Sequence, residues 1–171
     1  MSMVIPLPAP AYPATTDGLN AAESAFLLAL RWWVADYRHR VDPMPRLREV
    51  MHCAGPRDAA ICVDQLMTLI AHTARAPVGI QCPQCRHLTH DEKLLLHAAS
   101  LVQAGDGGLA GRLLRIDLLP AAAATFALGV LAELAELFSD AGLGFRRRRM
   151  PDDMPTPCEA STSPAWSRAL H

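Results

Sequence analysis

The stretch "LNAAESAFLLALRWWVADYRH", residues 19–39, decides the fold class of this chain. Phe26, Leu30 and Trp33 recur at the three- and four-residue spacing of one helix face, and the opposite side of the helix is apolar too. A helix that is hydrophobic nearly all round is typical of the centre of a bundle. Arg31 interrupts the apolar run well before the ~18 residues of a membrane span, so we expect no membrane insertion.

Further apolar patterns with helical period follow the first one, and prolines, caps and glycines mark their limits. Within these helices, Tyr37 and Phe126 are predicted to face the core. The pattern predicts an all-α fold, a compact bundle of five to six helices with one short extended or knuckle segment. After the first helix we expect a short helix that ends at Gly55 and a longer one from Pro56 to about Arg75. A further helix is expected from His90 to about Ala104, a weak one over "LAGRLLRI", and a last one from Pro120 to about Ala141.

Length and composition favour one folded domain. The chain has 171 residues, of which 51% are hydrophobic and 19% charged, enough for a core without staples. We expect a flexible, proline-rich arm over residues 1–17, a single helical domain over 18–144, and a disordered tail over 145–171. The N-terminus lacks the basic region and continuous apolar helix of a signal peptide, which favours a cytoplasmic protein.

The charge of the chain is unevenly distributed. Residues before Phe145 include 11 basic and 14 acidic ones, which argues against a folded nucleic-acid-binding face. The tail, by contrast, opens with four consecutive arginines that are typical of a solvated run and could attract nucleic acid without specificity. These are Arg146, Arg147, Arg148 and Arg149.

The segment "QCPQCRHLTH", residues 81–90, holds the chemistry that stands out. Its Cys-x-x-Cys turn brings two thiolates close enough to share a zinc ion, which needs two more ligands. Cys82, Cys85, one nearby histidine and either His52 or Cys53 would complete a tetrahedron and pin two distant helices together. The local histidines are His87 and His90, and Cys62 and His97 are further distant candidates.

A thiol redox centre is the alternative interpretation of Cys82 and Cys85. Thioredoxin-like centres place this motif at a helix N-terminus after a strand, where the helix dipole activates the first thiol. Here the capping-box spacing of Thr89 and Glu92 predicts a helix that starts beyond the motif. Five cysteines, an odd number, favour reduced thiols. Covalent haem attachment fails because Arg86 stands where a histidine is required.

Catalytic signatures are absent from the sequence. It contains no glycine-rich phosphate loop, nucleophile elbow or His-Glu-x-x-His pair. We therefore favour a non-enzymatic accessory or regulatory protein-interaction module with a structural zinc at the Cys82/Cys85 knuckle. The alternatives are a thiol redox protein using the same cysteines and a nucleic-acid-associated factor acting through the arginine tail. Protein partners are expected, and a homo-oligomer is compatible with the surplus of apolar helix faces.

Overall fold

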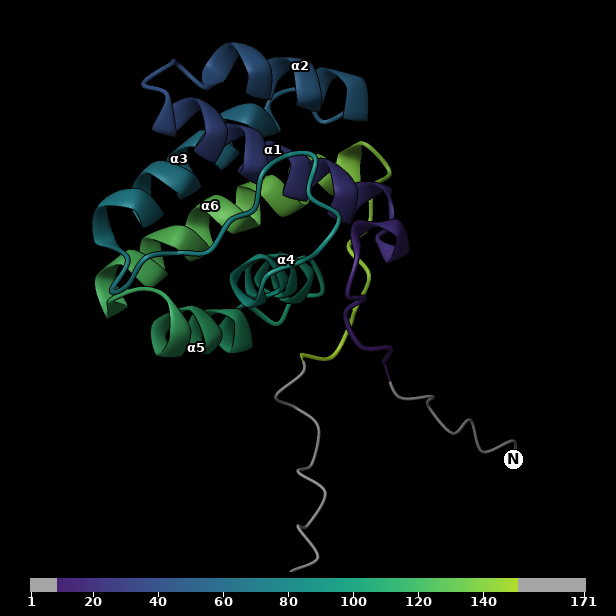
Figure 1. The fold of residues 1–171 in the computed structure, drawn as a ribbon. Helices are drawn as coiled ribbons and strands as arrows, with labels where there is room; N and C mark the ends of the chain where they lie inside the picture. The colour runs from purple at the N-terminus through teal and green to yellow at the C-terminus, as the bar shows by residue number, and fades with distance from the viewer. Residues whose placement is uncertain (1–8, 151–171) are drawn as a thin grey trace, which may run out of the picture.

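A computed structural model of the chain describes residues 9–150. Within that range it is all-helical and has no strand, which confirms the predicted bundle of five to six helices. In Figure 1, α2 lies at the top, α1, α3 and α6 cross the middle, and α4 and α5 lie at the bottom. The elements are a 3-10 turn, Thr16–Gly18, and six α-helices: α1 Ala21–Arg38, α2 Met44–Ala54, α3 Ala59–Thr73, α4 His90–Gln103, α5 Gly107–Asp117 and α6 Ala121–Asp140.

Local capping fixes where the helices begin and end. Thr89 accepts a hydrogen bond from the Glu92 backbone N–H at 3.1 Å, and the Glu92 carboxylate accepts one from the Thr89 N–H at 3.0 Å, as the spacing predicts. Asn20 and Glu23 form the same reciprocal box at the start of α1. Gly55 ends α2 with φ of +117°, a left-handed conformation that glycine adopts most readily.

Helix α6 is the long apolar helix of the core. Its buried residues are mostly alanine and leucine, which allow close packing against α3, α4 and α5. By length and composition α6 could also cross a membrane, with a mean hydropathy of 1.6 over a window that is 44% buried. The core helix of a soluble protein passes the same test of length and composition, and in this fold α6 packs against α3, α4 and α5.

Two aromatic residues predicted to face inward do not. Tyr37 is 49% exposed and Phe126 is 58% exposed. Tyr37 lies in the last turn of α1 and stacks on Trp33, with ring centroids 4.7 Å apart. On α6 the buried stripe passes through Ala123, Ala127 and neighbouring positions, which turns Phe126 outward.

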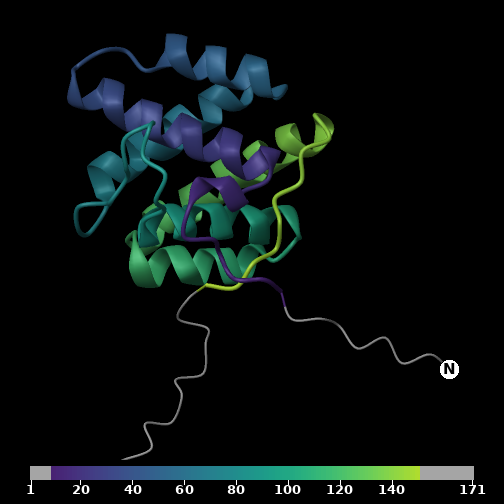
Figure 2. The ribbon, with the colours of Figure 1, turned by 45° about the vertical axis from the view of Figure 1, so that its right-hand side comes forward.

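The described parts of the two terminal segments pack against the bundle. Tyr12 and Phe145 are buried, and Ala11 pairs with Arg149 in a parallel bridge. Figure 2 shows the two segments lying side by side at the lower edge of the bundle. These contacts hold residues 9–17 and 145–150, which belong to the predicted arm and tail, against the bundle. The remaining parts of both predictions lie outside the described residues.

Candidate functional site

The connection between α3 and α4 carries the cysteine motif across the bundle (Figure 1). Ile80 and Leu88 are buried and anchor the connection on either side of the motif. Between these anchors the backbone bulges outward, so that Cys82 is exposed and Cys85 is half-buried. Residues 81–88, the cysteine loop, are thus an exposed turn held at both ends by apolar contacts.

A buried ion pair lies beneath the cysteine loop. Arg31 of α1 donates from Nε to Glu92 Oε1 at 2.7 Å and from Nη2 to Glu92 Oε2 at 3.0 Å, and both side chains are almost completely buried. This two-point geometry is the strong form of an arginine–carboxylate contact. The sequence interpretation of Arg31 as an interruption of the apolar run missed this role.

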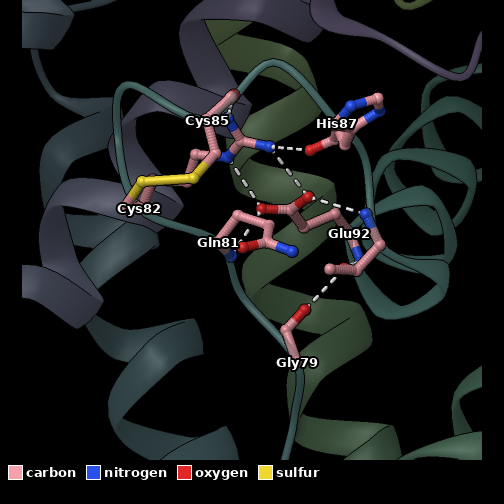
Figure 3. Close-up of polar contacts among 8 residues, drawn as sticks. Gly79, Gln81, Cys82, Cys85, His87 and Glu92 are labelled. Carbon is pink, nitrogen blue, oxygen red and sulfur yellow. Dashed lines mark hydrogen bonds and ion pairs between the residues drawn. A yellow bond between two sulfur atoms is a disulfide. The ribbon is translucent and has the colours of Figure 1, made fainter.

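The same two side chains also hold the loop backbone (Figure 3). Arg31 Nη1 donates to the Cys85 carbonyl, and Nη2 donates to the His87 carbonyl at 2.8 Å. Glu92 Oε1 accepts from the Gln81 N–H at 3.0 Å. Because these contacts satisfy both buried charges and the loop backbone together, the pair sets the position of the loop on α1 and α4.

Cys82 and Cys85 are joined by a disulfide, with their Cα atoms 5.4 Å apart (Figure 3). A backbone hydrogen bond from the Cys85 N–H to the Cys82 carbonyl, 3.1 Å long, closes the turn, and Pro83 restricts it further. The sequence favours reduced thiols, and the structure differs because this preformed turn brings the two sulfurs together. Exposure of Cys82 leaves its sulfur accessible to other thiols.

The other predicted zinc ligands lie apart from this pair. His87 and His90 are exposed, and no three His, Cys, Asp or Glu side chains within residues 9–150 converge to hold a metal ion. Cys53, near the end of α2, lines a separate groove between α1 and α2. Sulfurs bonded to each other do not present the thiolates that zinc requires. The zinc site stays a prediction.

Of the remaining distant candidates, Cys62 is unsuited to ligand chemistry. It is 1% exposed within α3, and burial, together with the negative charge of Glu133, raises the pKa of its thiol to about 11. A thiol with so high a pKa stays protonated at neutral pH, whereas a metal ligand or nucleophile must be a thiolate. Cys62 is therefore a core residue.

The cysteine loop is paired with the chain's N-terminal segment. Thr15 and His87 form an antiparallel bridge, the Thr16 N–H donates to the Arg86 carbonyl at 2.8 Å, and the Leu88 N–H donates to the Ala14 carbonyl at 3.1 Å. Nothing in the local pattern of residues 9–17 indicates this pairing, because the partners are 70 or more positions away. A change in the loop can therefore reach the N-terminal segment through direct hydrogen bonds.

That N-terminal segment also forms backbone hydrogen bonds with the arginine run. The Arg149 N–H donates to the Pro10 carbonyl at 2.9 Å, and the Tyr12 N–H donates to the Arg149 carbonyl at 3.3 Å. Residues 10–16 thus connect the two regions: residues 10–12 bond to the run, and residues 14–16 bond to the cysteine loop. The cysteine loop and the arginine run, which no sequence pattern relates, are therefore linked through the N-terminal segment.

Arg148 corrects the prediction that the arginine run is solvated. It is 5% exposed, and its guanidinium contacts the Glu23 carboxylate at 2.7 Å. Hydrogen bonding to Glu23 raises the pKa of Arg148 further above its usual value. Arg147 pairs with Asp106 at 2.5 Å. The run therefore offers less free positive charge than its sequence suggests, and nucleic-acid binding through it stays a prediction.

Two hollows lie along α1, and the cysteine loop lines one of them. One of about 300 Å³ is lined by Arg31 and Leu28 of α1, by Leu19, and by the Pro83–Cys85 part of the loop. A second of about 610 Å³ lies between α1 and α2 and shares Leu28 with the first. The loop thus forms part of a concave, mainly apolar surface that extends along α1.

The chemistry available at this site is thiol–disulfide exchange at an exposed sulfur beside an apolar surface. No protein-family model, curated protein or solved structure matches the chain. The function is therefore inferred from the contacts of the loop itself.

Proposed function

We propose that the protein is a non-enzymatic helical interaction module in which Cys82 and Cys85 act as a thiol–disulfide switch. The observation that carries this proposal is the disulfide at an exposed turn whose two ends are held by the buried Arg31–Glu92 pair. Such anchoring keeps the two sulfurs near each other when the bond is broken. Both redox states are then accessible without unfolding of the bundle.

The exchange needs a thiol reductant such as glutathione or a protein dithiol. The reductant's thiolate attacks the exposed Cys82 sulfur and forms a mixed disulfide, and the electron pair of the broken bond leaves on Cys85 as a thiolate. A second reductant thiolate attacks the reductant's own sulfur in the mixed disulfide and releases Cys82. The two cysteines gain two electrons and two protons, and the reductant becomes a disulfide.

The consequence of reduction follows from the neighbouring backbone. Residues 86–88 directly follow Cys85 and carry the hydrogen bonds to residues 14–16. Opening the short disulfide ring restores rotational freedom to the loop, which weakens these hydrogen bonds. The hollow lined by Leu19, Leu28 and Cys85 then changes shape, so binding of a protein partner at this surface becomes dependent on redox state.

Thiol counting and metal analysis test this proposal. After equilibration with oxidised glutathione, peptide mass spectrometry should find Cys82 and Cys85 joined to each other and protected from maleimide, and reduction should make both thiols reactive. Cys82→Ser and Cys85→Ser should abolish this internal bond, whereas Cys53→Ser should retain it. About one zinc per chain in the reduced protein, lost on substitution of Cys82, would instead establish the structural-zinc alternative and overturn the switch.

Hydrogen exchange tests the coupling. Reduction should accelerate amide exchange at residues 14–16 and 86–88 in the wild-type chain, and a Cys82→Ser, Cys85→Ser double variant should exchange rapidly there under both conditions. Equal exchange rates in oxidised and reduced wild-type protein would show that the disulfide does not control this surface.

A further inference from the structure

A third hollow, of about 460 Å³, lies on another part of the molecule, between the last turns of α1 and α3 and the connection at residues 76–80. Its floor is formed by the buried side chains of Trp33, Ile70 and Ile80. The indole N–H of Trp33 donates to Asp64 at 2.8 Å, so the ring presents no free donor to the hollow. Tyr37, stacked on Trp33, extends the apolar wall toward solvent.

Two exposed arginines line this hollow. They are Arg38 at the end of α1 and Arg75 just after α3, and no acidic side chain lines the hollow within residues 9–150. Neither guanidinium has an ion-pair or hydrogen-bond partner among the described residues. The nearest acidic residue along α1, Asp36, is paired with Arg46 at 3.1 Å.

We propose that this hollow binds an aliphatic carboxylate, with its alkyl chain on the floor and its carboxylate between Arg38 and Arg75. The fixed planar donors of a guanidinium suit a carboxylate, and two of them beside an apolar floor select an anion with a hydrophobic body. The volume falls within the range of roughly 300–1,000 Å³ that is usual for small-molecule sites. This site does not depend on the redox function of Cys82 and Cys85.

Binding of decanoate by the full-length protein tests the proposal. We expect saturable, one-site binding by calorimetry, with amide shifts concentrated at residues 74–80 and in the last turn of α1. Decanol and decyltrimethylammonium, used below their aggregation limits, separate the contribution of the carboxylate from that of the alkyl chain. Decanol should bind at least about tenfold more weakly, because it lacks the negative charge that both guanidinium groups contact, and the cation should bind more weakly still.

Variants at the rim and at the floor complete the test. Arg38→Gln and Arg75→Gln should each weaken decanoate binding by about three- to tenfold without changing the melting temperature, because both side chains are exposed. Arg112→Gln, on the exposed face of α5, is the matched control and should bind decanoate normally. Ala71→Trp should block the hollow. Absence of decanoate binding, equal binding of decanol, or unchanged binding by the Arg38/Arg75 double variant would overturn the proposal.

Discussion

Arg148, 125 positions after Glu23 in the sequence, donates two hydrogen bonds to the Glu23 carboxylate. Arg148 Nε lies 2.7 Å from Glu23 Oε1, and Arg148 Nη2 lies 2.8 Å from Glu23 Oε2. Arg148 also donates to the Gly18 carbonyl at 2.7 Å. The pair thus fastens the chain's last described segment to the first turn of α1. Helix α1 carries a second buried pair at Arg31, so Glu23 and Arg31 each secure a non-helical segment against the bundle.

Removal of the Arg148 side chain should destabilise the protein strongly. Arg148→Ala leaves the Glu23 carboxylate buried without its counter-ion, which typically costs about 3–5 kcal/mol. The exposed neighbour Arg146 provides the control, and Arg146→Ala should change stability by less than about 0.5 kcal/mol. Urea unfolding followed by circular dichroism measures both. Equal stabilities of the two variants would mean that residues 145–150 do not contribute to the fold.

The Arg31–Glu92 pair should behave as a coupled unit. Arg31→Met and Glu92→Leu each leave one charge and several loop hydrogen bonds unsatisfied, and each should cost about 3 kcal/mol or more. The double variant should lose less than the sum of the single losses, by at least about 1 kcal/mol, because neither charge then remains buried alone. A double-mutant cycle in urea gives the coupling energy. Simple additivity would contradict the contact geometry.

The two free cysteines should differ sharply in their reaction with iodoacetamide. Cys53 is exposed and should be alkylated rapidly in the folded protein. Burial raises the pKa of Cys62 to about 11, so its thiol stays protonated near neutral pH and its labelling should rise as the pH approaches 11. Mass spectrometry of the Cys53→Ser variant isolates Cys62. Rapid labelling of Cys62 near neutral pH would contradict its burial.

The cap of α1 should contribute measurably to stability. Asn20→Ala removes both the capping contact to Glu23 and the side-chain hydrogen bond to the Gly144 carbonyl, so we expect a loss of about 1–2 kcal/mol. Ser24→Ala, one turn further along the exposed side of α1, should stay within about 0.5 kcal/mol of the wild type. The difference in melting temperature between the two variants measures the cap.

Local signals explain what could be predicted from the sequence. The Thr89–Glu92 box and the stop at Gly55 are short-range patterns, and the structure places both helix limits as they indicate. Asn20 and Glu23 have the same spacing and could have been found in the same way. The structural role of Arg148 could not be predicted in this way, because it depends on the Glu23 carboxylate, 125 positions away in the sequence.

At the candidate site, too, short-range features could be predicted from the sequence, and features that depend on packing could not. Cys-x-x-Cys spacing predicts that the sulfurs of Cys82 and Cys85 come close, and they do. Whether close sulfurs bind a metal or each other depends on which further ligands pack nearby. Cys53 lies on the groove between α1 and α2, a placement set by helix packing that no local pattern encodes. The contribution of Arg31 to holding the loop depends on packing in the same way.

The parallel bridge between Ala11 and Arg149 has a consequence for the connectivity of the chain. Because the two ends of the described fold lie close to each other at one edge of the bundle (Figure 2), a short glycine-rich linker could join them into a closed ring. The ring could then be opened in the exposed turn at residues 39–42, between α1 and α2. Such a circular permutant would keep every helix contact, and its order of synthesis would begin with α2.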